Sequence, residues 1–122
     1  EPATYVGHDK VAELFAKGGA VAKSGDFTAS VASRTGPGQV EVHEKETDIF
    51  YITSGDATFI TGGTEGGGKL SRAAQWLGTE NQVGVTHTLT KGDIITIPAG
   101  TPHWFKEVKT PIFYYMVKVI HP

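Results

Sequence analysis

The chain has 122 residues and a mass of 13.0 kDa, a length typical of one domain that buries roughly two-thirds of its unfolded surface. Its net charge of −2 and pI of about 6.2 provide no basic stripe for phosphates, and no apolar run approaches the ~20 residues of a membrane span. We therefore expect neither nucleic acid nor a membrane as a partner. The chain has no cysteine, which excludes disulfides and thiolate chemistry, and its compartment, cytoplasmic or exported, stays open.

The first predicted element is a short amphipathic helix over residues 9–17. Asp9 is a suitable N-cap, and Gly18-Gly19 ends the helical pattern. The apolar residues of one helix face are Val11, Leu14 and Phe15.

From Phe27 onward the hydrophobic period changes to two, which is typical of strands. The predicted strands are 27–32, 39–43, 48–53, 56–61, 83–90, 93–97, 103–108 and 112–120. The turns that separate them are Gly36-Pro37-Gly38, Ser54-Gly55-Asp56, Gly62-Gly63, Lys91-Gly92-Asp93 and Thr110-Pro111. Residues 62–81 are irregular, and 73–77 could form a strand or a helical turn. Many short strands with regular turns predict a β-sandwich or a barrel.

A turn, an apolar strand and a second turn fix the direction of His103. Residues 94–97 are strand formers, and Pro98 ends the strand because it cannot donate to a central ladder. Gly100 can adopt a positive φ, and Pro102 holds the residue before it in extended geometry. A histidine aimed by two rigid turns is a good candidate for a metal ligand or a catalytic group.

This segment resembles the second motif of the cupin family, G-x5-P-x-G-x2-H-x3-N. Gly92, Pro98, Gly100 and His103 are all in place, and Glu107 replaces the final Asn.

Residues 36–55 resemble the first cupin motif, G-x5-H-x-H-x3/4-E-x6-G, with Asp48 in place of the Glu. Because this half holds one histidine, two alignments are open. If His43 is the second ligand, Glu41 takes the place of the first histidine; if His43 is the first ligand, Lys45 takes the place of the second. A lysine ammonium at that position would repel a metal and could pair with a carboxylate instead.

The resemblance implies an all-β fold, an antiparallel double-stranded β-helix (the jelly-roll cupin barrel) with one short N-terminal helix. A single cupin domain would span residues 1–122, with 1–25 as an N-terminal extension that contains the helix and 26–120 as the β-barrel. The resemblance also implies one divalent transition metal inside the barrel and a small-molecule ligand or substrate at its mouth.

The predicted metal ligands are His43, Asp48, His103 and Glu41. Residues two apart in a strand project to one face, so Glu41 and His43 point together, unless a one-residue slip turns them outward. Imidazole and carboxylate groups suit Fe, Mn, Ni or Zn. The structural alternatives stay open: a solvated strand end for His43, an ion pair or turn for Asp48, and backbone capping for His103.

His87 is a further candidate, as a general base or an extra ligand. It shares strand parity with Leu89, whose apolar side chain indicates an inward face, so a hydrogen-bonded core histidine is the alternative. The predicted pocket walls, which core packing explains equally well, are Phe50, Ile52 and Phe105.

The last predicted strand, 112–120, is apolar on both faces. In an antiparallel sheet this pattern predicts that the core covers one face and that the helix or a second subunit covers the other. We therefore expect a homodimer.

Two functions fit this sequence. The first is a metal-dependent enzyme of the oxygenase, isomerase or lyase type that acts on a small polar molecule. The second is a non-catalytic cupin that binds or senses a small molecule with a degenerate metal site. The fold does not choose between them, because cupin barrels host many chemistries.

Overall fold

The computed structural model describes residues 3–66, 69–72, 75–78, 80–82 and 84–122. One helix, α1 (His8–Lys17), precedes a set of antiparallel strands. The strands are β1 (Gly19–Lys23), β2 (Phe27–Arg34), β3 (Val40–His43), β4 (Glu46–Thr61), β5 (Thr64–Gly66), β6 (Lys69–Arg72), β7 (Gln75–Gly78), β8 (Glu80–Gln82), β9 (Val85–Thr90), β10 (Ile94–Ile97) and β11 (His103–Ile120). The all-β fold class with one short N-terminal helix is confirmed.

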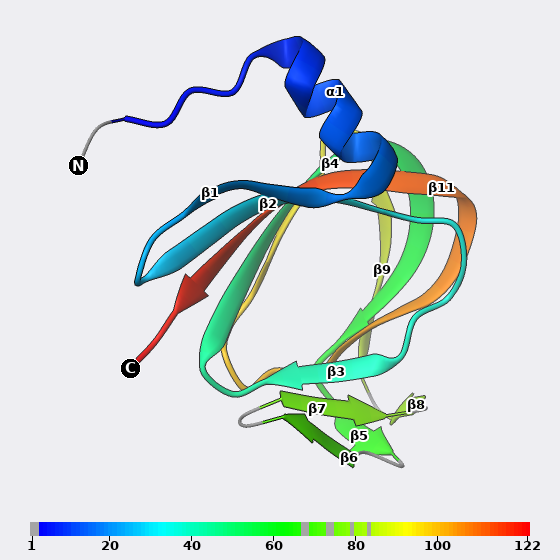
Figure 1. The fold of residues 1–122 in the computed structure, drawn as a ribbon. Helices are drawn as coiled ribbons and strands as arrows, with labels where there is room; N and C mark the ends of the chain where they lie inside the picture. Colours follow the sequence, from blue (N-terminus) through cyan, green and yellow to red (C-terminus); the bar gives the residue numbers. More distant parts are fainter. Residues whose placement is uncertain (1–2, 67–68, 73–74, 79, 83) are drawn as a thin grey trace.

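Two long, bent strands organise the fold (Figure 1). β4 and β11 pair antiparallel along their whole length, from Thr61 opposite His103 to Glu46 opposite Ile120. The expected strand breaks at residues 54–56 and 110–111 are therefore wrong, because both turns bend a strand without ending it. Gly55 has φ 92°, and a Cβ at this position would overlap the backbone carbonyl of Pro111, so only glycine allows the two corners to stack.

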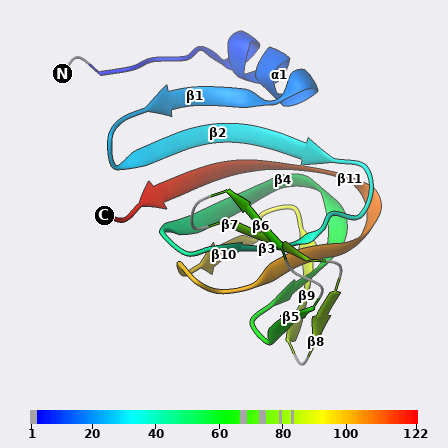
Figure 2. The ribbon, with the colours of Figure 1, turned by 60° about the horizontal axis from the view of Figure 1, so that its bottom comes forward.

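The two bends divide the strands into two layers that close into a barrel. One layer contains β1, β2, the second half of β11, the first half of β4, and β10. In Figure 2, β1, β2, β11 and β4 lie side by side. The other layer contains β3, the first half of β11, the second half of β4, and β9, with β7 and β6 continuing beyond β3. This arrangement is the predicted cupin barrel.

Some strands were not expected from the sequence, and one open alternative is decided. β1 is an additional strand that pairs with β2, and β5 pairs with β8 in a separate two-stranded ribbon. Within 73–77, Gln75 to Leu77 belong to β7, which makes the strand alternative right there, while 73–74 lie outside the described residues. Val83, the first residue of the predicted strand 83–90, also lies outside them.

The side chains of β11 alternate between the inside and the outside of the barrel, as the period of two requires. The inward row is Ile112, Tyr114, Met116 and Lys118. The first of these pack into a core of aromatic and aliphatic side chains in which Phe50 and Phe59 meet edge to face at 5.8 Å. Lys118 is thus the charged member of an otherwise apolar inward row, and this position matters for the site.

α1 lies over the outer face of the first layer (Figure 1). Its Phe15 ring meets Phe113 of β11 edge to face, with centroids 6.2 Å apart. The expected N-cap, Asp9, is wrong, because the helix begins earlier and its N-cap is Gly7. Asp9 lies in the first turn, where its negative charge interacts favourably with the helix dipole. The helix ends at Gly18 with φ 76°, as predicted. Within the described chain, α1 is too short and too polar to cross a bilayer.

Candidate metal centre

Three carboxylate and imidazole side chains from two distant segments of the chain meet inside the barrel. β3 projects Glu41 and His43 to the same side, and Glu41 pairs directly with His103 at the start of β11. One potential ligand atom from each of the three lies within 4.8 Å of the others. The centroids of the His43 and His103 imidazole rings are 4.9 Å apart. The structure therefore brings together three of the four predicted metal ligands in one tight group.

The fourth predicted ligand, Asp48 of β4, lies beside this group and is only 2% exposed. Its Oδ2 is 3.6 Å from Nε2 of His43 and 3.6 Å from Nε2 of His103. Metal–ligand bonds of about 2.0–2.2 Å place neighbouring ligand atoms of a tetrahedral site about 3.3–3.6 Å apart. Its other oxygen, Oδ1, accepts a hydrogen bond of 2.7 Å from Nζ of Lys118. Asp48 thus has one oxygen paired with a lysine and one directed at both imidazoles.

The orientation of His103 is set by a backbone carbonyl. Its Nδ1 is 3.1 Å from the oxygen of Thr101, and because that oxygen can only accept, Nδ1 carries the proton. In the neutral ring Nε2 then has a free lone pair that faces Oδ2 of Asp48. Burial lowers the pKa of His103, which favours this neutral form. Nε2 of His103 and Oδ2 of Asp48 thus direct lone pairs at each other, and a cation between them would stabilise this arrangement. The side chains of this group are therefore suitable ligands for a divalent metal.

The same burial predicts how the metal-free protein responds to acid. The pKa of His103 is lowered from 6.5, so between that lowered value and 6.5 the unfolded chain binds a proton that the folded chain does not. The free energy of unfolding should therefore decrease as the pH falls through this window. Thermal melts of chelator-treated protein between about pH 8 and about pH 5 should show a steeper loss for the wild type than for His103→Gln. Equal slopes for the two proteins would contradict the assignment.

The structure separates the two alignments of the first motif by where each side chain lies. Glu41 and His43 belong to the group of ligand atoms, whereas Lys45 is exposed in the turn between β3 and β4. An ammonium group does reach the site, but it comes from Lys118, whose Nζ is also 3.5 Å from Oε1 of Glu46. Sequence reasoning missed Lys118. The signal was present, since it is the one charged residue in the apolar run 112–120.

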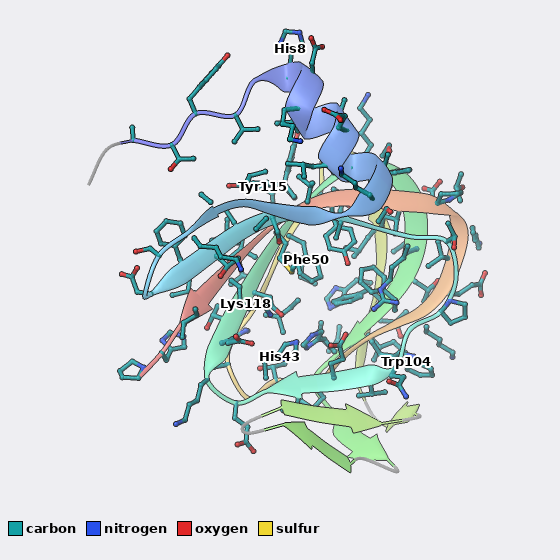
Figure 3. All side chains as sticks on the ribbon, viewed as in Figure 1. His8, His43, Phe50, Trp104, Tyr115 and Lys118 are labelled. Atoms are coloured by element: carbon teal, nitrogen blue, oxygen red, sulfur yellow. The ribbon has the colours of Figure 1, made fainter. Side chains whose placement is uncertain are left out.

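A cavity of about 270 Å³ opens beside the side chains of Glu41, His43 and His103. Its lining residues are Arg34, Glu41, His43, Asp48, Phe50, His103, Phe105, Tyr114, Met116 and Lys118. Phe50 and Phe105 thus form apolar walls, as predicted, while Ile52 belongs to the core and does not line the cavity. Figure 3 shows the side chains of His43, Phe50 and Lys118 in the barrel interior, whereas His8 lies far away at the start of α1.

His87, the predicted general base, lies on β9, outside the group formed by Glu41, His43 and His103. It is opposite Phe59 in the β4–β9 pairing, and its Nε2 forms a hydrogen bond of 2.8 Å with Oγ1 of Thr61. It does not line the cavity. The geometry corresponds to the alternative for this position, a hydrogen-bonded histidine on an inward strand face. A role of His87 in proton transfer stays a prediction.

The sequence of this chain matches a known protein family. The family described as Cupin matches residues 20–121, a range that covers the barrel and both motifs. The chain belongs to the cupin family. The predicted resemblance is thereby confirmed. No curated protein sequence matches this cupin significantly.

Several solved structures share the fold of this cupin at low sequence identity. BH2720 from Bacillus halodurans has a TM-score of 0.70 and 16% identity, covering 99% of this chain and 86% of that one. Hydroquinone 1,2-dioxygenase from Sphingomonas sp. TTNP3, with 4-hydroxybenzoate bound, has a TM-score of 0.65 and 15% identity, covering 92% and 73%. The Schizosaccharomyces pombe Cnp3 cupin domain has a TM-score of 0.61 and 15% identity, covering 84% of this chain and 59% of that one. These likenesses establish the fold alone.

Proposed function

We propose that this cupin binds one divalent transition metal (Fe, Mn, Ni or Zn) and is a metal-dependent enzyme of the oxygenase, isomerase or lyase type for a small polar molecule. The observation that carries this proposal is the convergence of Glu41, His43 and His103 within 4.8 Å, at the wall of a cavity. Three protein ligands leave coordination positions for a substrate or water. A dioxygenase with the same fold shows that a barrel of this kind can host an enzyme.

Each residue of the group would have a distinct task. Glu41, His43 and His103 would hold the metal, and Oδ2 of Asp48 is close enough to both imidazoles to serve as a fourth ligand. A divalent metal bound there supplies Lewis acidity. The carbonyl of Thr101 keeps Nε2 of His103 free of its proton. The aromatic cavity walls exclude part of the water, which strengthens the electrostatic interactions inside.

Metal content tests this function. The protein should be purified without chelators and without a metal-binding affinity tag, and its metals measured by elemental analysis. We expect about one equivalent of a first-row transition metal per chain, because the donor set suits such ions. Less than about a tenth of an equivalent, together with no uptake of Zn²⁺, Fe²⁺, Mn²⁺ or Ni²⁺ on titration, would contradict the proposal.

A second candidate function is a metal-free cupin that binds or senses a small molecule. The observation that favours it is the ion pair between Lys118 and Asp48 at 2.7 Å, because an ammonium group already neutralises one carboxylate of the site. Nη2 of Arg34 lies 3.8 Å from Oε2 of Glu41, and its positive charge partly neutralises this second carboxylate. Metal-free protein that binds small molecules tightly and converts none of them, in air or without it, would support this candidate over the enzyme.

We also propose that the protein is a homodimer formed through the outer face of the first layer. Ile94, Tyr51 and Tyr115 are directly opposite one another across β10, β4 and β11, and they are 68%, 46% and 37% exposed. α1 packs against Phe113, where the second half of β11 begins. This row of exposed apolar side chains on a monomer is what a twofold contact of ~1,200 Å² or more would cover.

Sedimentation at micromolar concentration tests the dimer. The wild type should sediment at twice its 13.0 kDa, and Tyr51→Glu, which places a charge at the centre of the row, should sediment as a monomer. Tyr5→Glu is the matched control, because Tyr5 is 90% exposed in the segment before α1 and should leave the dimer intact. A wild type that sediments only at 13.0 kDa would refute the dimer.

A further inference from the structure

The guanidinium group of Arg34 lies at the wall of the cavity, in a slot between the ring of Phe105 and the backbone of Gly38. Arg34 is the last residue of β2, and its Cζ lies 5.1 Å from the centroid of the Phe105 ring. Gly38 lies against the same group, since a Cβ at that position would be 2.7 Å from Nη1. Gly38 is itself fixed, because its N–H donates to the carbonyl of Phe105 and its carbonyl accepts from Nε1 of Trp104, both at 2.9 Å.

The N–H donors of this guanidinium exceed the acceptors around it. The positive charge of Arg34 partly offsets the rise that burial causes in the pKa of the Tyr114 hydroxyl, which places that hydroxyl near the guanidinium. Its nearest carboxylate, Glu41, is 3.8 Å from Nη2, which is too long for a hydrogen bond. Its Nε is buried and has no acceptor among the described residues. A buried donor without an acceptor is unfavourable, so a small shift of the side chain onto an incoming acceptor would be favoured.

The charged side chains that line the cavity balance one another, with Arg34 and Lys118 against Glu41 and Asp48. A divalent metal held by the proposed ligands would leave the cavity net positive, which would favour an anion. A planar fork of N–H donors matches a carboxylate, which accepts two parallel hydrogen bonds. The volume of about 270 Å³ and the aromatic walls leave room for a short apolar body beside that carboxylate.

We propose that this cavity binds small carboxylic acids, with Arg34 holding the carboxylate and the aromatic walls holding the body of the molecule. The inference names the substrate class of the proposed function and rests on that function for turnover. Binding of the carboxylate by Arg34 does not itself require a metal. Carboxylate binding by Arg34 and the metal-dependent function can therefore fail separately.

Titration with benzoate and with its neutral analogue benzamide tests the inference, on metal-loaded and on chelator-treated protein. Benzoate should bind at least tenfold more tightly than benzamide to metal-loaded wild type. Arg34→Gln should lose that preference while benzamide affinity stays unchanged, and Arg34→Lys should recover only part of it, because lysine keeps the charge but lacks the fork. Gly38→Ala should weaken benzoate binding by displacing the guanidinium with its charge intact.

The control is Lys91→Gln, which removes an exposed cation from the turn after β9 and should leave both affinities unchanged. Equal affinity of benzoate and benzamide for the wild type, or an unchanged preference in a folded Arg34→Gln protein, would overturn the inference. A benzoate preference in protein that takes up no metal would support the carboxylate site while the metal-dependent function fails. Metal uptake without any preference for benzoate would support the metal site and overturn the carboxylate site.

Discussion

Replacing His103 with alanine should lower the affinity for a divalent metal by more than about a hundredfold, because it removes one of the three proposed ligands. His103 is also the residue whose Nε2 is kept free of a proton, because its Nδ1 donates to the carbonyl of Thr101. Asp48→Ala should cost less, since one oxygen of Asp48 is already engaged with Lys118. Titration of the chelator-treated proteins with Co²⁺, followed by its visible absorption, measures both effects.

The matched control is His8→Ala, because the side chain of His8 is 96% exposed at the start of α1 and should not influence the metal. Circular dichroism should show that all three variants retain the strand content of the wild type. If a folded protein that carries both His43→Ala and His103→Ala binds as much metal as the wild type, the metal centre lies elsewhere or does not exist.

Replacing Lys118 with methionine should have two large effects of opposite direction. Metal affinity should rise tenfold or more, about 1.4 kcal/mol, because the ammonium 2.7 Å from Oδ1 of Asp48 repels a cation and competes for that carboxylate. The metal-free protein should be less stable by roughly 3 kcal/mol, because a carboxylate that is 2% exposed loses its partner. Saturating Zn²⁺ should restore most of this stability, since the metal then compensates the same charge.

Lys45→Met is the control for Lys118→Met, because Lys45 is exposed in the turn after β3. It should change neither the metal affinity nor the melting temperature by much, and Lys45→His should leave the affinity unchanged as well. Thermal melts with and without Zn²⁺, together with metal titrations, measure these effects. An unchanged or weaker metal affinity in Lys118→Met would show that the lysine does not oppose the metal, which would also remove the basis of the metal-free alternative.

Local pattern determined the strands, the helix and the directions of several side chains. The period of two from Phe27 onward and the turn residues predicted an antiparallel barrel, and the rigid turns around His103 predicted that it opens a strand. These features follow from adjacent residues, since φ restrictions and strand parity act over a few positions. The same reasoning ended two strands too early. Gly55 and Pro111 are turn formers by composition, but their mutual packing makes them corners of continuous strands.

Only the tertiary structure decided which charged side chains share the interior. The sequence singled out Lys45 because it lies beside His43, yet the ammonium at the site comes from Lys118 at the other end of the chain. It gave no sign of Arg34, whose slot depends on Gly38 and on a ring of β11. Strand parity states which side chains share a face within one strand, but the register between distant strands determines which of them meet. That register arises from the packing of the whole barrel, and no short stretch of sequence contains it.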